Sequence, residues 1–259
     1  IRDHRGGGRS SARETIGRVA AGAIAEKFLK QLNISVTAYA KSIGPVEVSP
    51  ERMDLSEIPN NQFCLPDADS AKEAEHYLDQ KIAECDSVGG VVECVISGLP
   101  AGLGEPVFEK LDANLAKAIL SIGAVKGFEI GDGFAATKAC GSENNDEFRM
   151  DGDKIVKETN HAGGVLGGIS DGSAVIFRAA FKPTPSIAKS QETVTKDGEN
   201  IDLVIHGRYD PVVVPRAVVV VESMAAITAM DMLLMSMTSR LDLIQMFFQV
   251  ENVDDSPEQ

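Results

Sequence analysis

Residues 215–247 constrain the fold most, because this segment is long, helical in pattern and apolar on nearly every side. It reads "PRAVVVVESMAAITAMDMLLMSMTSRLDLIQMF". Pro215 suits the first turn of a helix, where a backbone N–H is not needed. A helix that is apolar all round has to be buried, so we expect it in the core or in a subunit interface. Its methionines are most simply core filling.

The rest of the chain alternates between helical and strand patterns. The capping-box pattern Ser11-Ala12-Arg13-Glu14, followed by apolar residues at helical spacing, predicts a helix over 11–32. The other predicted elements are helices at 68–85 and 106–124, strands at 33–44, 89–100, 126–134 and 173–186, and a hairpin around Asp197-Gly198. Residues 135–172 are polar and glycine-rich, and we expect long functional loops there.

Composition narrows the class of protein and its partners. The chain has 259 residues, a pI near 4.7 and a net charge of −14, which disfavours broad binding to nucleic acids or anionic membranes. Its four cysteines lack C-x-x-C spacing, and we expect free thiols rather than a metal site. We see no signal peptide and no uninterrupted apolar span, so we expect a cytoplasmic protein. Because Ile1 opens directly inside a dense motif, we also expect a longer natural chain.

Arginines gather at the start of this acidic chain, in the stretch "RDHRGGGRSSARE". Guanidinium groups can bind phosphate through bidentate, charge-assisted hydrogen bonds. The free N–H groups of the following helix would add donors, and the glycines would allow close backbone approach to a ligand. The stretch therefore predicts a pocket for a small anion, with a flexible turn beside a basic helix face as the alternative.

Three further motifs carry weaker signals. "AGGVLGGIS" offers glycine pairs for close approach to a planar ligand, or simply tight turns. "KPTPS" at 182–186 offers one cation and two hydroxyls on a stiff turn, or an ordinary loop. "GRYDPVVVPRA" places Arg208 and Asp210 on a proline-bounded turn before the apolar helix. Together they indicate a phosphorylated substrate and a flat, phosphate-bearing cofactor. A P-loop kinase is disfavoured because the G-x-x-x-x-G-K-[ST] pattern is missing.

Five motifs, taken in order, resemble the chorismate synthase family over nearly all of residues 1–235. They are "RGGGRSSARET", "SIGAVKGFEIGDGF", "NHAGGVLGGIS", "FKPTPSI" and "GRYDPVVVPRAVVVVESMAA". The resemblance implies an α+β fold, a β-α-β sandwich with long buried inner helices, as one domain over 1–250. We expect residues 251–259 to be a disordered tail. It also implies a homotetramer and reduced FMN as cofactor.

The resemblance also implies site residues. Asp210 would be catalytic, near flavin N5, and Ser11, Ala12 and Arg13 would touch the substrate. Family motifs that bind FMN correspond here to Arg9, Ser10, Ser11, Gly123, Ala124, Gly167, Lys182, Pro183, Thr184, Pro185, Ser186 and Arg208. The implied reaction is a 1,4-elimination of phosphate from 5-enolpyruvylshikimate 3-phosphate to chorismate, the last step of the shikimate pathway. The first arginines would then stabilise charge on the leaving phosphate.

The sequence departs from the family pattern in several places. His4 replaces a tyrosine, Tyr209 a histidine, Val212 a cysteine, and Gly123 a common asparagine. Family members also begin about a hundred residues upstream, with a G-E-S-H-G motif and a second histidine that act as general acids. A chain that truly starts at Ile1 would then be a poor catalyst. A non-catalytic FMN- or phosphate-binding oligomeric fragment is therefore the alternative, and an NADPH-linked flavin reduction stays open.

Overall fold

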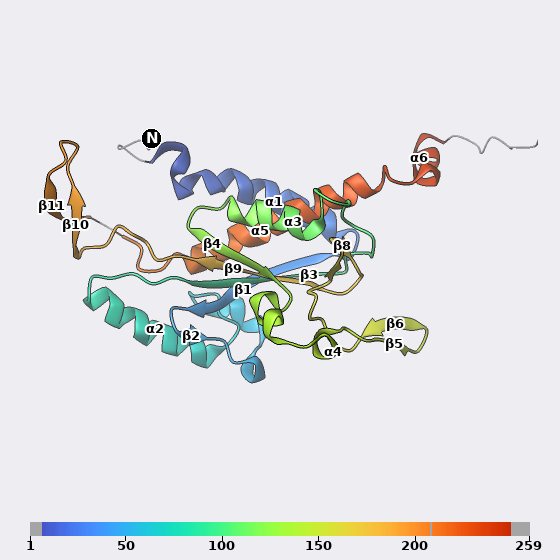
Figure 1. Cartoon of the computed structure of the whole chain (residues 1–259), viewed down its shortest axis with the longest axis horizontal. Coiled ribbons are helices and arrows are strands. Elements are labelled where there is room, and N and C mark those ends of the chain that lie inside the picture. The colour runs from blue at the N-terminus through green and yellow to red at the C-terminus, as the bar shows by residue number, and fades with distance from the viewer. Residues whose placement is uncertain (1–6, 208, 250–259) are drawn as a thin grey trace, which may run out of the picture.

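A five-stranded antiparallel sheet forms the centre of the computed structural model, which describes residues 7–207 and 209–249. Its strands follow the order β2-β1-β3-β9-β4 (Figure 1). They are β1 (Ser35–Ile43), β2 (Val46–Glu47), β3 (Gly90–Ser97), β4 (Val125–Ile130) and β9 (Val175–Phe181). Buried residues alternate along β3 and β9, as expected for strands with one face on a core.

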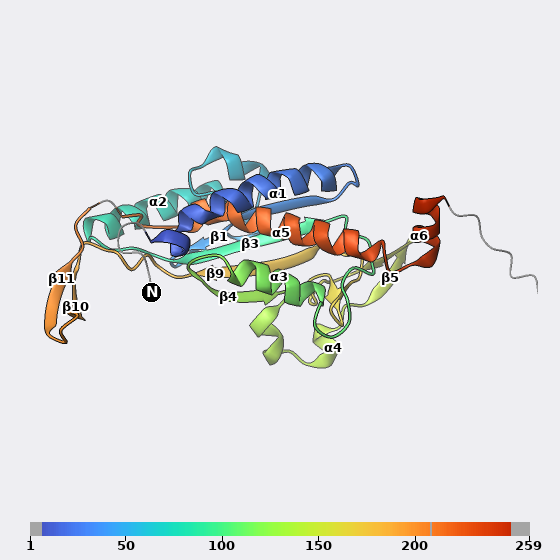
Figure 2. The same ribbon diagram turned by 90° about the horizontal axis from the view of Figure 1, so that it is seen from above.

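Three helices cover the apolar face of this sheet. They are α1 (Thr15–Lys30), α3 (Leu111–Leu120) and α5 (Val214–Ser236), which lie side by side in the view of Figure 2. The core between the layers includes Val92, Cys94 and Ile96 of β3 and Phe177 of β9, all fully buried. The opposite face carries polar side chains, such as Glu93, which is paired in register with Arg178. The helix α2 (Ala68–Ala83) lies on that side (Figure 1).

The helix α5 is buried as the sequence predicts, but the predicted helix over 215–247 is too long. It ends at Ser236, and a separate short helix, α6 (Leu241–Phe248), follows without any buried residue. The hydroxyls of Ser236 and Thr238 donate to backbone carbonyls one turn back, and Arg240 has an extended backbone. Such local hydrogen bonds compete with helix continuation. By length and hydropathy α5 could cross a membrane, but half of its most apolar window is buried inside the molecule.

The prediction of long loops over 135–172 is wrong. This stretch contains the η5 turn (Gly133–Lys138), α4 (Gly141–Asn144) and two hairpins, formed by β5 (Phe148–Asp151) with β6 (Lys154–Lys157) and by β7 (Val165–Leu166) with β8 (Ile169–Ser170). Gly152 turns the first hairpin with a φ of 60°. The dipeptide Asp151-Gly152 is thus the same turn signal as Asp197-Gly198.

Other boundaries shift slightly. The predicted hairpin around Asp197-Gly198 is present as β10 (Ser190–Val194) and β11 (Asn200–Val204), and it projects from one end of the molecule (Figure 1). α3 starts at Leu111 rather than near 106, because Val107 has a positive φ of 69° and turns the chain. The η1 (Gly8–Ser10) and η2 (Ala12–Glu14) turns precede α1, and η3 (Pro50–Arg52) and η4 (Leu55–Asn60) precede α2. The predicted tail 251–259 lies outside the described residues.

Candidate functional site

The glycine-arginine stretch forms a tight entry into α1. Gly7 and Gly8 have φ values of 83° and 52°, which glycine adopts without strain. The Ser10 hydroxyl donates to the Gly7 carbonyl at 2.5 Å, and the Ser11 hydroxyl accepts from the Arg13 backbone N–H at 3.3 Å. The reciprocal half of the predicted capping box is not formed, because Glu14 instead accepts from Arg18 at 3.0 Å. Ala12 and Arg13 are exposed beside this turn.

Arg18 joins this entry turn to the turn that carries Gly123 and Ala124. Its guanidinium donates to the hydroxyl of Ser121 at 2.5 Å and to the Ser121 carbonyl at 3.3 Å. Ser121 follows the last residue of α3. Ala124 has a φ of 74°, and Gly123 is exposed with open space around it. The first and second predicted segments therefore lie at the same end of the sheet.

The loop at 182–186 is attached to the same turn. The Lys182 backbone N–H donates to the Ala124 carbonyl at 3.0 Å, where β9 ends beside the start of β4. Ser87 donates from its hydroxyl to the Thr184 carbonyl at 2.6 Å. The Thr184 hydroxyl oxygen is buried and has no hydrogen-bond partner among the described residues. Lys182, Pro183 and Pro185 are exposed, and Ser186 is half-buried.

The turn before α5 completes this group. The Pro211 carbonyl accepts from the Val88 N–H at 2.8 Å, which holds the turn against the residues before β3. The Asp210 carboxylate pairs with Arg216 in the first turn of α5 at 2.8 Å. Arg208 lies outside the described residues, and so does the side chain of Arg9. We call the residues at 10–13, 123–124, 182–186 and 209–211 the end cluster.

Gly167 does not join the end cluster. It forms the turn between β7 and β8, next to the N-terminus of α3, where the Gly168 carbonyl accepts from the Leu111 N–H. This hairpin adjoins the first residue of β9, Val175, whereas Lys182 follows its last residue. Seven residues of strand separate the two positions, roughly 20 Å at the usual rise per residue.

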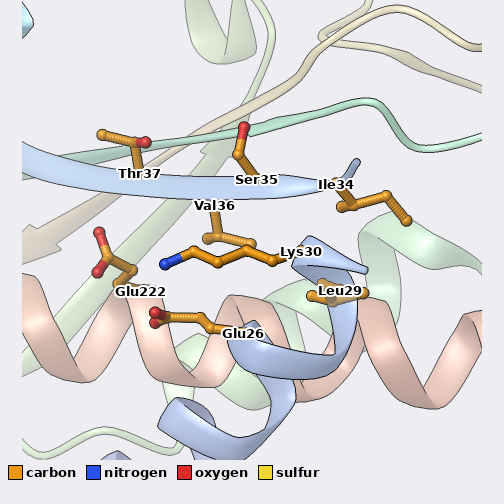
Figure 3. Close-up of a pocket in the computed structure, with 8 residues that line it drawn as sticks. All are labelled: Glu26, Leu29, Lys30, Ile34, Ser35, Val36, Thr37 and Glu222. Carbon is orange, nitrogen blue, oxygen red and sulfur yellow. The ribbon is translucent and has the colours of Figure 1, made fainter. Parts of the chain in front are cut away.

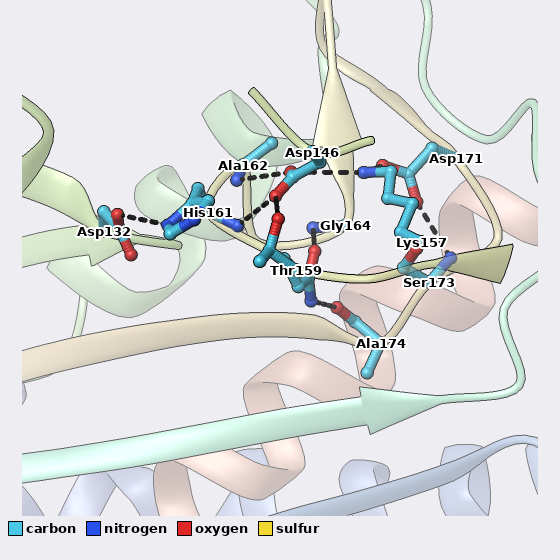
Figure 4. A network of polar contacts seen from close by, with 11 residues as sticks. Asp132, Asp146, Lys157, Thr159, His161, Ala162, Gly164, Asp171, Ser173 and Ala174 are labelled. Atoms are coloured by element: carbon cyan, nitrogen blue, oxygen red, sulfur yellow. Dashed lines mark hydrogen bonds and ion pairs between the residues drawn. The ribbon is translucent and has the colours of Figure 1, made fainter. Parts of the chain in front are cut away.

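A buried ion network holds the chain near Gly167 (Figure 4). The Lys157 ammonium, with 3% of its side chain exposed, pairs with Asp171 at 2.5 Å and with Asp146 at 3.4 Å. Asp146 also accepts from the Thr159 hydroxyl and from the backbone N–H groups of His161 and Ala162. Burial raises the pKa of Asp146, but these hydrogen bonds outweigh it and lower the pKa to about 2. The charged groups of this network pair with one another and with nearby backbone, so the network is structural and is not part of the end cluster.

A separate pocket of about 230 Å³ lies between α1, β1 and α5 (Figure 3). Glu222 of α5 accepts from the Ala38 backbone N–H at 2.7 Å, at the open edge of β1. Burial raises the pKa of Glu222, the nearby charge of Glu26 raises it further, and the bond from Ala38 opposes both. Lys30 extends between the two carboxylates in Figure 3. None of the residues lining this pocket belongs to the end cluster.

The described residues offer hydrogen-bond donors at the end cluster and no cluster of metal ligands. No group of three or more His, Cys, Asp or Glu side chains is placed to hold a metal ion within the described ranges. The four cysteines are free, and Cys94 is fully buried. The end cluster instead combines hydroxyls, one lysine, and backbone at a helix entry, which are donors suited to phosphate.

Comparison with known proteins decides the family. The family model described as "Chorismate synthase" matches residues 1–234. A chorismate synthase of Lachnoclostridium phytofermentans is 60% identical over 250 residues, covering 96% of this chain and 68% of that protein. The chain belongs to the chorismate synthase family. The chorismate synthase of Agathobacter rectalis is 62% identical over 249 residues, with the same shares covered.

The fold agrees with this family assignment. A solved structure described as "Crystal Structure of Chorismate Synthase" matches with a TM-score of 0.75 at 30% identity, covering 92% of this chain and 69% of that one. The predicted α+β class is confirmed, since helices cover an antiparallel sheet. The chain spans about two thirds of the length of these chorismate synthases.

The residues of the end cluster fit the flavin cofactor implied by the family. The clearest observation is the buried Thr184 hydroxyl, which has no hydrogen-bond partner among residues 7–207 and 209–249, because a polar atom of this kind calls for a ligand or a rearranged loop. Motif spacing missed three residues that assemble the cluster, namely Arg18, Ser87 and Arg216. Arg18 follows the arginine stretch and was the one with a signal in the sequence. Arg216 lies inside the quoted stretch at 207–217, where the motif predicted no role for it, and Ser87 has no signal in the sequence.

Proposed function

We propose that this chain acts in the chorismate synthase reaction, the 1,4-elimination of phosphate from 5-enolpyruvylshikimate 3-phosphate to give chorismate. This makes it a carbon–oxygen lyase acting on phosphates, at the last step of the shikimate pathway. The observation that carries the proposal is the end cluster, in which hydrogen bonds connect four motif segments, up to about 200 residues apart in the chain, at one end of the sheet. We place the enzyme in the cytoplasm, without nucleic-acid or membrane partners.

The end cluster would hold reduced FMN. The cofactor would contact Ser10, Ser11, Gly123, Ala124 and the segment Lys182-Pro183-Thr184-Pro185-Ser186, with Arg9 and Arg208 proposed from their motifs. The two prolines have no backbone N–H and would contribute packing rather than hydrogen bonds. Lys182 supplies a cation that can neutralise a phosphate. When bound, reduced FMN supplies electron density to the allylic system of the substrate. Reduction of the flavin by NADPH belongs to the same proposal.

The substrate would lie beside the first turn of the chain. Ser11, Ala12 and Arg13 present a hydroxyl, a small side chain and an exposed guanidinium at the entry to α1. A guanidinium there stabilises the charge that develops on the departing phosphate. Asp210 is the proposed catalytic carboxylate, and Arg216 orients it through the 2.8 Å ion pair. Tyr209 keeps a hydrogen-bonding ring next to it.

The position of Gly167 is connected with the proposed homotetramer, because Gly167 can reach an FMN site only in another copy of the chain. A flavin at the end cluster meets the Gly167 of its own chain only by spanning the sheet, since the two lie roughly 20 Å apart. A second copy of the chain can present its Gly167 without that span. We therefore propose that the FMN contact of Gly167 is made across a subunit interface.

The test is anaerobic turnover with dithionite-reduced FMN, following chorismate by its absorbance, together with FMN binding by quenching of flavin fluorescence. We expect the chain to bind FMN and the Lys182→Ala variant to bind it at least tenfold more weakly, the scale of a lost charge-assisted contact. FMN binding without chorismate would leave the non-catalytic alternative. A chain that binds neither FMN nor substrate would contradict the proposal.

A further inference from the structure

Three consecutive residues before β3 hold two of the four segments of the end cluster, the 182–186 loop and the turn at 209–211. Asp86 pairs with Lys189 at 2.6 Å, just beyond the 182–186 loop. Ser87 donates from its hydroxyl to the Thr184 carbonyl at 2.6 Å. Val88 donates its N–H to the Pro211 carbonyl at 2.8 Å and forms a parallel bridge with Val212. We call the residues 86–88 the seat.

The chain at the seat packs closely against the end of β9 and the 182–186 loop. The neighbouring Gly89 lies so close to β9 that an added Cβ would come within 2.3 Å of the Phe181 carbonyl and 3.2 Å of Pro183. Ser87 and Val88 are buried, with 9% and 6% exposed. The Ser87 N–H donates to the Asp86 carboxylate at 2.8 Å, which ties the ion pair to the same backbone. The seat is thus a packed segment, anchored by its two buried residues.

Among the described residues, no hydrogen bond or ion pair joins the 182–186 loop directly to the Asp210 turn. The β10–β11 hairpin separates them in the chain, and every residue of β11 is exposed. A two-stranded hairpin of this kind is only marginally stable by itself and cannot fix the relative position of its two ends. The contacts to the seat supply the missing constraint, and the Ser87 bond fixes the backbone that carries the Thr184 hydroxyl.

We propose that Ser87 is a positioning residue of the FMN site, which with Asp86 and Val88 holds the 182–186 loop and the Asp210 turn in one fixed relation. This inference rests on the proposed function of the end cluster. Ser87 does not touch the cofactor. It orders the donors before FMN arrives, so that binding loses less conformational entropy.

The experiment compares Ser87→Ala with the matched control Ser70→Ala. Ser70 is also buried, at the first turn of α2, and its hydroxyl lies 2.6 Å from the Asp67 carboxylate and 3.0 Å from the Glu47 carbonyl. Two readouts are needed: hydrogen exchange by mass spectrometry of the peptides containing Val88 and Lys182 in the cofactor-free chain, and the FMN dissociation constant.

We expect Ser87→Ala to speed exchange in both peptides and to weaken FMN binding about fivefold, the scale of one hydrogen bond. Ser87→Thr keeps the hydroxyl and should restore affinity. Ser70→Ala should lower the melting temperature but leave FMN affinity within about twofold. Equal FMN affinities for Ser87→Ala and Ser70→Ala, with unchanged exchange in the two peptides, would overturn the inference.

Two safeguards separate the possible failures. If the wild-type chain does not bind FMN, the proposed function fails, while the exchange measurement still tests whether the seat joins the two segments. If Ser87→Ala does not fold, Lys189→Met removes the partly exposed ion pair of the seat instead. That variant should speed exchange around Lys182 and weaken FMN binding about twofold, because the pair is solvent-screened. Unchanged values for it would count against the seat.

Discussion

Lys157 is a lysine with almost no exposed surface, held between two carboxylates that are themselves buried. An arrangement of this kind is costly to break, because removing one partner leaves an uncompensated buried charge. The Asp146 carboxylate also accepts hydrogen bonds from three other groups, and its pKa is lowered to about 2. The pKa of Asp171 is also lowered, by the bond from Lys157 acting against burial. Protonation of these carboxylates at low pH should therefore weaken the network.

The first prediction is that the Asp146→Asn variant loses part of the acid sensitivity of the chain. A carboxyl with a lowered folded-state pKa contributes stability above its unfolded pKa, near 4, and loses it as pH falls toward 2. The contribution at pH 7 is about 2 kcal/mol. Urea unfolding at pH 7 and pH 3 should therefore show a smaller pH difference for Asp146→Asn than for the wild type.

The matched control is Asp197→Asn, in the exposed turn of the β10–β11 hairpin. It removes the same charge where no buried lysine is present, so its pH difference should equal that of the wild type. Asp146→Asn will also be less stable at pH 7, since Lys157 loses one carboxylate partner. A pH difference unchanged by Asp146→Asn would show that the network is not the source of acid sensitivity.

At the scale of elements, the closest crossing in the core is between α1 and α5. An added Cβ at Gly22 of α1 would lie 2.3 Å from the Cβ of Ser223 and 2.5 Å from its Cα. Glycine and serine together let the two helices approach with their backbones almost in contact. The crossing also fixes the entry turn, because α1 begins at the end cluster.

The second prediction is that Gly22→Ala destabilises the chain by about 2–3 kcal/mol, because the helices must move apart to admit a methyl group. Gly17→Ala is the control on the same helix, with open space around the position, and should stabilise by about 0.5–1 kcal/mol through helix propensity. Thermal melting of both variants checks this. If Gly22→Ala were as stable as Gly17→Ala, the close crossing would be wrong.

The sequence identified most elements because their patterns reflect burial on one face. The alternation in β3 and β9 and the helical spacing in α1 and α2 are such patterns, and the structure confirms these elements. The region 135–172 was missed since its order comes from a buried ion network, whose polar residues resemble a loop in sequence. The break after α5 depends on local hydroxyl bonds that hydropathy does not reveal.

At the scale of the molecule, the motifs predicted which segments share a site, but they did not predict how the fold arranges those segments. Four of the predicted segments meet at one end of the sheet, as a shared ligand requires. Gly167 was predicted for the same site from its motif, and only the course of β9 places it at the opposite end. The seat had no motif of its own, because hydrogen bonds to backbone carbonyls place few demands on sequence. The sequence motifs indicated which residue types could bind the ligands, but the positions of those residues relative to one another depend on the fold.

The separation of Gly167 from the end cluster leads to the third prediction, which concerns the assembled protein. Lys182→Ala disables the end cluster of a chain, and Gly167→Asp disables its far end. Aspartate tolerates the φ of 61° at Gly167, and open space surrounds the position, so the variant should fold. We expect each variant alone to bind FMN poorly. If each site is shared between two copies, an oligomer that mixes the two variants contains some sites with both wild-type residues, Lys182 from one copy and Gly167 from the other.

Random mixing of the two variants in equal amounts should restore about a quarter of the wild-type FMN sites, because each site draws its two residues independently from two copies. The measurement is FMN stoichiometry by titration after unfolding and refolding the mixture together, with separately refolded variants as the control. A site built within one chain predicts no recovery at all, since every chain then carries one defect. Recovery in the co-refolded sample alone would show that the oligomer, and not the single chain, is the unit that binds the cofactor.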